Sequence, residues 1–438
     1  MAYRNFDDTN LDRRALLRSG ALFGGGALLA GAPLASALAQ ARPAAWPAVT
    51  AMVQDYVAQR KVANMVATLG WGQQAPQTIA RGTLAIGQTQ PAGADSLYRI
   101  YSMTKPITGM AAMILIDEGK LGLDQPVADI LPAYARMRVL KSATGPIAET
   151  VAADRPITIR HLLTHTAGLG YGITQRGPID ALYVERGLTP GQVSRLPLPG
   201  LGRGTAVRGL GAFADKLATV PLVYQPGTKW SYSVGLDLLG RVIEVVGKQP
   251  FDRFLDERIF KPAGMTSTWF RVPASEVGRF TTNYGILNGT PIPIDPARAS
   301  VYLDEPAFPF GGAGLVSSPR DYDRFLRMLA GLGAIDGKRV MSERAVRLGT
   351  SNLLPAGVST KGTFADGSGF GAGGRSNDGN YGWGGAAGTV AFVNIASGLR
   401  GHLMTQYMPA EAYPVHSAFP AAVLKDVAAM MPAKKAAA

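Results

Sequence analysis

The sequence predicts an α/β fold in which the two ends of the chain form one central antiparallel sheet flanked by helices. The longer strand-like runs lie near these two ends, at 64–72, 78–87, 389–395 and 400–408. Between them, residues 121–380 show mainly helical periodicity, with long loops rich in Gly and Pro. Helical patterns over 44–59 and 421–431 supply cover for the sheet.

This pattern also predicts the domain organisation. The chain has 438 residues, of which 47% are hydrophobic and 17% charged, and this composition is typical of a globular protein with a sizeable core. We expect one domain over residues 40–438, with an α/β part (40–120 and 381–438) and an all-α part (121–380). A catalytic cleft is expected where the two parts meet.

The first elements follow from the spacing of their apolar residues. In the first helix these recur at helical spacing, at Val49, Met52, Val53, Tyr56 and Val57. A polar turn before Pro76 indicates that the first two strands form a hairpin. Residues 97–100 are expected to form a short third strand, which leads into an apolar helical run up to about residue 119.

Capping residues mark helix starts in the middle of the chain. Thr158 has the side chain preferred at the N-cap of one helix, and Ser317 or Ser318 at that of a helix over 321–332. An amphipathic run over 235–247 predicts another helix. These helices form the bulk of the expected all-α part.

Residues 1–39 have the features of a bacterial export signal. Arg13 and Arg14 precede an apolar Gly/Ala/Leu run over 21–30, and Ala-Leu-Ala at 37–39 is a typical cleavage site. The paired arginines indicate the twin-arginine route and so predict a periplasmic or secreted protein. A retained anchor is disfavoured because the apolar run is short and Gly-rich, and no stable membrane insertion is expected after signal removal.

Charge and cysteine content exclude several kinds of function. The formal net charge is +13, but the basic residues are scattered, without long runs and without interleaved aromatic residues. This pattern favours a general attraction to anionic surfaces and argues against nucleic-acid recognition. The absence of cysteine excludes disulfides, a thiol nucleophile and a Cys-ligated metal.

The segment 101–106 carries the first candidate catalytic residues. Ser102 and Lys105 are three positions apart, so on a helix their side chains project from the same face. Unpaired N–H groups at a helix start favour negative charge on the serine oxygen, and a desolvated lysine can accept its proton. The pair alone is weak evidence, because most Ser-x-x-Lys pairs are solvated helical neighbours.

Two further stretches accompany this pair. Tyr232 follows a Pro-Gly turn and precedes Ser233 and Val234 near the start of a predicted helix. The run Trp-Gly-Gly-Ala at 383–386 enters a predicted strand. Taken singly, the tyrosine is more often a packing residue, and the Gly-rich run is more often a bulge or turn.

In this order, the three stretches resemble the serine hydrolases of the class C β-lactamase fold. This superfamily includes D,D-peptidases and penicillin-binding proteins, and the resemblance is strongest to family VIII carboxylesterases. Residues 161–169, 259–266 and 312–315 also resemble it, so that the similar segments together span about 95–395. The resemblance implies a β-lactamase/transpeptidase-like fold that uses no metal and no cofactor.

The resemblance also implies roles for individual residues. Ser102 would attack an acyl carbonyl, Lys105 would accept its proton, and Tyr232 would serve the leaving group and the hydrolytic water. The backbone N–H groups of Ser102 and Ala386 would form the oxyanion hole. The residues expected to contact substrate are Tyr101, Val234, Trp383, Gly384 and Gly385.

Two departures from the superfamily pattern bear on the substrate. In β-lactamases and D,D-peptidases an Asn occupies the place of Val234 and contacts a substrate amide, and a Lys that meets a carboxylate occupies the place of Trp383. Both changes favour neutral, apolar substrates, and Trp-Gly-Gly is common among family VIII esterases. We therefore expect an esterase of small to medium neutral esters that acts through an acyl-enzyme.

Alternatives to the esterase stay open at this point. An amide hydrolase of the same fold is possible if Arg375 binds the substrate carboxylate, and a penicillin-binding sensor would acylate without turnover. His161 and His165 are four apart on a helix, but structural hydrogen bonding is a better interpretation than metal binding. No Gly-x-Ser-x-Gly motif indicates an α/β-hydrolase, and the sequence specifies no oligomeric state.

Overall fold

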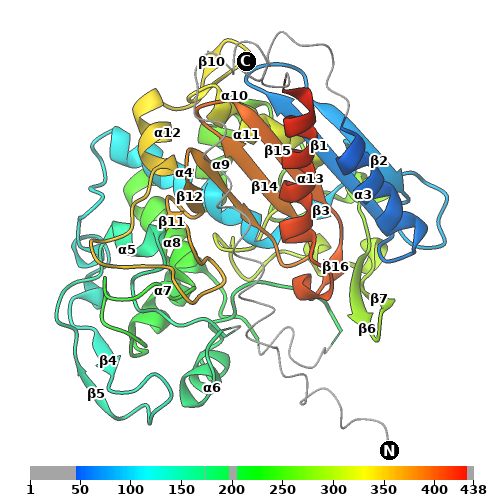
Figure 1. Cartoon of the computed structure of the whole chain (residues 1–438). Helices are drawn as coiled ribbons and strands as arrows, with labels where there is room; N and C mark the ends of the chain where they lie inside the picture. The colour runs from blue at the N-terminus through cyan, green and yellow to red at the C-terminus, as the bar shows by residue number, and fades with distance from the viewer. Residues whose placement is uncertain (1–45, 173, 197–204, 432–438) are drawn as a thin grey trace, which may run out of the picture.

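The computed structural model describes residues 46–172, 174–196 and 205–431, so the predicted export signal lies outside the described residues. Its central element is a seven-stranded antiparallel sheet with the order β11-β12-β13-β14-β15-β1-β2 (Figure 1). These strands are β1 (Asn64–Trp71), β2 (Gln77–Gly82), β11 (Gly369–Phe370), β12 (Arg375–Asn377), β13 (Asn380–Gly384), β14 (Val390–Asn394) and β15 (Leu399–Met404).

The sheet joins the two ends of the chain, as the sequence predicts. In the first hairpin Val66 of β1 pairs with Ala80 of β2, and in the last Phe392 of β14 pairs with Gly401 of β15. The two hairpins meet where β1 pairs with β15, with Thr68 opposite His402. The prediction of one antiparallel sheet built from both ends of the chain is therefore confirmed.

Helices cover both faces of this sheet. On one face lie α3 (Pro47–Ala58) and α13 (Val415–Met430), and on the other lies α11 (Pro319–Ala330) (Figure 1). An apolar cluster that includes Val53 of α3, Leu69 of β1 and Val423 of α13 fills the first interface. Because both faces are covered, every residue of β1 is buried.

The second part of the molecule is mainly helical and surrounds α4 (Thr104–Asp117). All residues of α4 except the last are buried, since it packs against α8, α9 and α12. The other helices of this part are α5 (Ile159–Leu163), α6 (Pro178–Glu185), α7 (Leu210–Ala218), α8 (Gly235–Gly247), α9 (Phe251–Leu255), α10 (Lys261–Ala263) and α12 (Glu343–Thr350). Thr158 caps α5, and Ser318 caps α11 by accepting the N–H of Asp321 at 3.2 Å, as expected.

The segment 121–380 is not all-α, contrary to expectation. It contains three two-stranded hairpins: β4–β5 (Arg138–Leu140 and Thr150–Ala152), β6–β7 (Asn283–Leu287 and Thr290–Asp295) and β9–β10 (Ala334–Ile335 and Lys338–Arg339). It also supplies β11 and β12 to the edge of the main sheet. Strands β4, β5, β9 and β10 have only two or three residues, and β11 and β12 lie in a Gly-rich stretch that has no apolar alternation. The β6–β7 hairpin is longer, and the Asn-Gly pair at 288–289 between its strands is a signal that could have predicted it.

Three other boundaries differ from the predicted ones. The strand β3 (Tyr98–Arg99) pairs with β8 (Val316–Ser317) in a separate small sheet. The predicted strand 400–408 is split, since β16 (Tyr407–Met408) pairs with β6 in parallel. The last helix starts at Val415 instead of 421, because burial of its first turns against the sheet outweighs the helix-breaking effect of Pro420.

Candidate active site

The candidate nucleophile lies where the chain turns into the central helix. Ser102 is the middle residue of a 3-10 turn, Tyr101–Met103, that leads directly into α4. The backbone of Tyr101 has a φ of 41°, a conformation that is unfavourable for a residue with a Cβ and concentrates at functional sites. Ser102 is half-buried, so its hydroxyl is accessible at the start of an otherwise buried helix.

Lys105 lies beside this hydroxyl. Its Nζ is 3.2 Å from the Oγ of Ser102, as the spacing of the two residues predicts. The lysine side chain is fully buried, and its Nζ also donates to the carbonyl oxygen of Gly312 at 2.7 Å. A buried amine in hydrogen-bonding contact with a serine hydroxyl has the geometry of a proton acceptor for that hydroxyl.

Tyr232 lies on the other side of the same amine. The Nζ of Lys105 is 4.5 Å from the centroid of the Tyr232 ring and 5.6 Å from that of Tyr171. The phenol oxygen of Tyr232 accepts a hydrogen bond from the indole Nε1–H of Trp383 at 3.1 Å. The three sequence stretches therefore meet at one point, where Ser102 is half-buried and the side chains of Tyr232 and Trp383 are almost fully buried.

A buried carboxylate contacts the same site through Gly312. The Oδ1 of Asp237, in the first turn of α8, accepts the N–H of Gly312 at 2.9 Å. Burial raises the pKa of Asp237 to about 6, and the charge of Lys105 acts in the opposite direction. A Cβ at position 312 would lie 2.7 Å from the Oδ2 of Asp237, which explains the need for glycine there. Sequence reasoning missed this role of Asp237, although an acidic residue on a buried helix face is a usable signal.

His165 positions the stretch that carries Tyr232. Its Nδ1 accepts the backbone N–H of Ser233 at 3.2 Å, and its ring is 4.5 Å from the Tyr232 ring between centroids. Burial lowers the pKa of His165 well below its usual value, so the imidazole is neutral. His161 instead completes the capping box of α5, its Nδ1 accepting the N–H of Thr158 at 3.1 Å. Both have the structural roles that were expected.

The oxyanion hole stays a prediction, and the two backbone N–H groups assigned to it have the following surroundings. β13 contacts the 3-10 turn that holds Ser102, and a Cβ at Gly385 would lie 2.4 Å from the carbonyl oxygen of Ile100. This close approach, which only glycine permits, brings Ala386 near the nucleophile. Within the described part of the chain, neither Ser102 nor Ala386 donates its backbone N–H to another protein group. Two such free donors are what a developing oxyanion requires.

Three other residues predicted to contact substrate, Tyr101, Val234 and Gly384, each lie in different surroundings. Tyr101 points away from Lys105: its ring packs edge-on against Tyr302 at 6.3 Å, and its hydroxyl accepts a hydrogen bond from Asn283 at 3.2 Å. Val234 is fully buried in the core at the start of α8. Gly384 lies next to the imidazole of His416, whose Nε2 would be 3.0 Å from a Cβ at this position. A substrate contact by any of these residues stays a prediction.

Aromatic side chains form the walls around Tyr232. The ring centroids of Tyr171, Phe364 and Trp383 are 5.1, 5.2 and 5.7 Å from that of Tyr232. The guanidinium carbon of Arg375, on β12, lies 5.1 Å from the centroid of the Trp383 ring. Aromatic rings therefore make up much of the surroundings of Tyr232, with Arg375 next to one of them.

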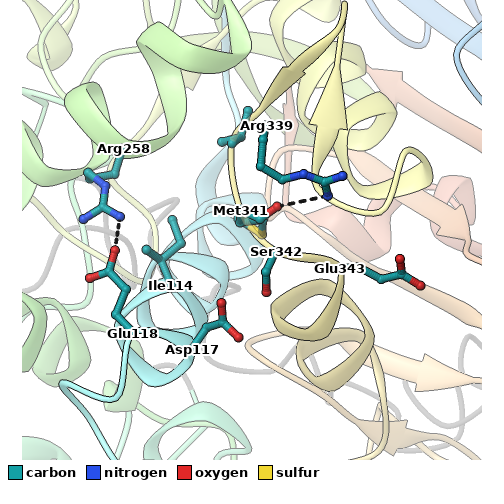
Figure 2. Close-up of a pocket in the computed structure, with 9 residues that line it drawn as sticks. Ile114, Asp117, Glu118, Arg258, Arg339, Met341, Ser342 and Glu343 are labelled. Atoms are coloured by element: carbon teal, nitrogen blue, oxygen red, sulfur yellow. Dashed lines mark hydrogen bonds and ion pairs between the residues drawn. The ribbon is translucent and has the colours of Figure 1, made fainter.

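A separate pocket lies at the opposite end of α4. Figure 2 shows it between Ile114, Asp117 and Glu118 of that helix region and residues 339–343, with Arg258 at one side. Its carboxylates are paired with arginines, Glu118 with Arg258, Asp117 with Arg344 and Glu343 with Arg347. This pocket has no nucleophile next to a base. Nor does any group of three or more potential metal ligands occur within the described ranges.

Comparison with known proteins identifies the family. A family model described as "Beta-lactamase" matches residues 49–423. The chain belongs to this beta-lactamase family. The match confirms the predicted superfamily of serine hydrolases, which includes the family VIII esterases, and the predicted fold.

Individual members of the family are similar to this chain over different lengths. Protein Rv1367c of Mycobacterium tuberculosis is 40% identical over 264 residues, which is 60% of this chain and 61% of that protein. Esterase EstB of Burkholderia gladioli is 29% identical over 381 residues, covering 81% of this chain and 88% of the esterase. Lovastatin esterase of Penicillium rubens is 34% identical over 43% of each chain.

Solved structures of the family have the same architecture. EstCE1, a hydrolase with promiscuous acyltransferase activity, superposes with a TM-score of 0.67 and 25% identity over 85% of this chain and 97% of its own. Simvastatin synthase from Aspergillus terreus superposes with a TM-score of 0.69 over 88% of this chain and 98% of its own, at 20% identity. Relatives named as esterases support the prediction that this beta-lactamase family member is a hydrolase.

Proposed function

We propose that this protein is a serine carboxylesterase that hydrolyses small to medium neutral esters through an acyl-enzyme on Ser102. One observation carries the proposal. The amine of Lys105 is 3.2 Å from the Ser102 hydroxyl, and the adjoining Tyr232 hydroxyl meets an indole N–H where related amide hydrolases have a lysine. The first contact supplies an activated nucleophile, and the second supplies an apolar wall in place of a carboxylate-binding cation.

Acylation begins when the Oγ of Ser102 attacks the ester carbonyl carbon. As the new C–O bond forms, the serine proton moves to the Lys105–Tyr232 pair, which must have lost one proton beforehand. Negative charge develops on the carbonyl oxygen, and the N–H groups of Ser102 and Ala386 stabilise it. The bond to the leaving alcohol then breaks, the alcohol oxygen takes the proton back, and the acyl group remains on Ser102.

Deacylation repeats these steps with water as the nucleophile. The pair again accepts a proton, now from water that attacks the acyl carbonyl, and returns it to the Oγ of Ser102 as the acid leaves. Gly312 holds the Nζ of Lys105 in place for both halves of the reaction. Each proton that the Lys105–Tyr232 pair accepts is returned to the leaving alcohol or to Ser102, and no electrons are transferred, so the scheme balances without a cofactor.

An ester substrate is favoured by the walls of the site and by the relatives. The rings of Tyr171, Phe364 and Trp383 pack around the catalytic tyrosine. Contact of apolar acyl or alcohol groups of a substrate with these rings is favourable. Esterase EstB, which aligns with most of this chain, is named for an ester-hydrolysing activity. Both observations support neutral esters as the substrate class.

An amide hydrolase is the second candidate, and one specific observation favours it. Arg375 lies over the Trp383 ring and is a cation near the catalytic tyrosine. A substrate with a carboxylate, such as a β-lactam or a D-alanyl peptide, requires a cation of this kind. A sensor that acylates but does not release its acyl group is a weaker third possibility, since the site retains a complete proton-transfer pair.

A substrate panel tests the proposal. We expect p-nitrophenyl esters of short and medium chain length to be hydrolysed with an initial burst, and much faster than nitrocefin or a D-alanyl peptide. Ser102→Ala should abolish turnover, whereas Ser275→Ala, which changes an exposed serine, should not. Faster turnover of nitrocefin than of any ester would replace the esterase by the amide hydrolase, and stoichiometric labelling without turnover would support the sensor.

Export by the twin-arginine route is a further part of the proposal, and it rests on residues 1–39 alone. Within the described residues, no helix has the length and hydrophobicity required to cross a bilayer. We expect the wild-type protein in the periplasmic or secreted fraction of a bacterial host. Changing Arg13 and Arg14 to lysine should keep it in the cytoplasm, and unchanged export of that variant would contradict this route.

A further inference from the structure

Besides Lys105, the catalytic tyrosine is connected to a second cation, Arg375, through the indole of Trp383. The indole N–H of Trp383 donates to the Tyr232 oxygen at 3.1 Å, and the guanidinium carbon of Arg375 lies 5.1 Å from the centroid of that indole. The two residues are on adjacent strands, where Arg375 of β12 is opposite Gly382 of β13. Arg375, Trp383 and Tyr232 therefore form a continuous series of contacts that ends on a reacting oxygen.

The arginine is fixed in this arrangement by its own contacts. Its guanidinium donates to the carbonyl oxygen of Phe364, and the ring of Phe364 packs against both Tyr232 at 5.2 Å and Trp383 at 6.0 Å. Burial lowers the pKa of Arg375 to about 10, and the charge of Tyr232 acts against this lowering. The guanidinium therefore remains a cation at neutral pH, and it is electrostatically linked to the catalytic phenol.

We propose that Arg375 is a positioning residue that stabilises the anionic form of Tyr232 through the indole of Trp383. A cation over an indole face attracts its π electrons, which makes the N–H a stronger hydrogen-bond donor to the phenol oxygen. The charge of the guanidinium also acts directly on that oxygen, since aromatic rings exclude water between them. This inference deepens the proposed function and depends on it, because it concerns the same proton-accepting pair.

The other charged or titratable groups around Tyr232 do not supply this charge. Lys105 is a member of the pair itself. Burial holds His165 neutral by lowering its pKa, and it raises the pKa of Tyr171 well above its usual value. Asp237 on α8 carries a negative charge above about pH 6 and so opposes an anionic tyrosine. Arg375 is thus the cation that remains, among the described groups, to favour loss of a proton from the pair.

Related amide hydrolases have a positively charged lysine at the place of Trp383. In this protein Arg375, on the neighbouring strand β12, supplies a positive charge instead. A lysine there would meet both the tyrosine oxygen and a substrate carboxylate. With tryptophan at 383 the positive charge lies behind an indole, where it can act on the tyrosine through the ring. The arrangement separates activation of the nucleophile from attraction of anionic substrates, and so it fits an enzyme for neutral esters.

The test compares Arg375→Met, which removes the charge and keeps an apolar stem, with Arg375→Lys, which keeps the charge. Arg298→Met, at an exposed arginine, is the control. For Arg375→Met we expect the acidic limb of the pH profile of kcat/KM on a neutral p-nitrophenyl ester to move up by about one pH unit. Activity in the alkaline plateau should stay within a few-fold of wild type, and Arg375→Lys should restore much of the shift.

A second measurement does not depend on turnover. In the inactive Ser102→Ala background, the tyrosinate absorbance that disappears on adding Tyr232→Phe reports ionisation of Tyr232. Its midpoint should rise by about the same amount when Arg375→Met is introduced. If wild type hydrolyses no ester, the proposed function fails while this titration still tests the electrostatic link.

Three outcomes would overturn the proposal. The first is a pH profile and a tyrosinate midpoint that are unchanged in Arg375→Met. The second is a loss of activity that is uniform across pH, which indicates a purely structural role for the arginine. The third is a selective loss of turnover for half-esters that carry a carboxylate, with neutral esters unaffected, which makes Arg375 a substrate-binding residue instead.

Discussion

Asp237 and Lys105 contact the same residue, Gly312, the carboxylate accepting its N–H at 2.9 Å and the amine donating to its C=O at 2.7 Å. Neither side chain has exposed surface. The amine that we propose as the proton acceptor is therefore held by a carbonyl whose residue also binds a buried carboxylate. This relationship links the protonation of Asp237 to both the stability and the activity of the enzyme.

We predict that Asp237→Asn makes folding less sensitive to pH. Burial raises the folded-state pKa of Asp237 to about 6, so the native protein keeps a proton that the unfolded chain loses near pH 4. This carboxyl therefore lowers stability progressively as pH rises from about 4 to 6, and the full penalty of about 3 kcal/mol remains above pH 6.

The measurement is the difference in unfolding free energy between Asp237→Asn and wild type from pH 4 to 8. Asn keeps an oxygen that can accept the Gly312 N–H, so the variant should gain stability relative to wild type as pH rises through this window. Glu411→Gln, an exposed acidic residue far from α8, is the control. A difference that is flat across pH would contradict the elevated pKa.

Gly312→Ala should impair both folding and catalysis. A Cβ at this position would lie 2.7 Å from the Oδ2 of Asp237, so the turn must move and take the carbonyl away from Lys105. We expect a loss of about 1–3 kcal/mol of stability, typical of an overpacked core, and a loss of kcat. Gly278→Ala, where nothing lies within 4 Å, should change neither in thermal denaturation and ester assays. Full activity of the 312 variant would show that the carbonyl contact is dispensable.

Lys105→Met should reduce kcat/KM on p-nitrophenyl esters by about 100- to 10,000-fold, the range expected for loss of a proton acceptor. The fold should survive, because an apolar side chain of similar length fills the same fully buried space without a polar group that needs a partner. Thermal denaturation and steady-state kinetics on the same samples separate the two effects. A variant that keeps more than a tenth of the activity would contradict the role of Lys105.

Trp383→Lys should shift the substrate preference toward anions. The new ammonium can still donate to Tyr232, but it replaces an aromatic wall by a carboxylate-binding group. We expect neutral-ester kcat/KM to fall by roughly tenfold or more while nitrocefin turnover rises relative to it. Trp383→Phe keeps the wall and should lower both rates without changing their ratio. An unchanged ratio in the lysine variant would mean that residue 383 does not set the substrate class.

The arrangement of the fold was predictable where the sequence has strong periodicity. The hairpins around Ala80 and Gly401, the helix after Lys105 and the N-caps at Thr158 and Ser318 have clear local signals, and the structure confirms them. Strands β11 and β12 have only two and three residues in a Gly-rich stretch, so their pairing depends on tertiary contacts that local patterns do not encode.

Sequence motifs predict which side chains form the candidate site, but they do not predict the backbone groups that these side chains contact. Ser102, Lys105, Tyr232 and Trp383 belong to recognisable stretches, and the structure brings them together. The carbonyl of Gly312 and the stacking of Arg375 on Trp383 join residues far apart in the chain, and no short motif marks such contacts. Val234 is buried at the N-cap of α8, and its predicted contact with substrate stays a prediction.

The intact mass of the protein, quenched in acid during turnover of a p-nitrophenyl ester, tests the Ser102 acyl-enzyme most directly. We predict one added acyl group per chain, found on the peptide that contains Ser102 and absent in Ser102→Ala. An acyl group on another residue, or ester turnover by Ser102→Ala at the wild-type rate, would contradict it.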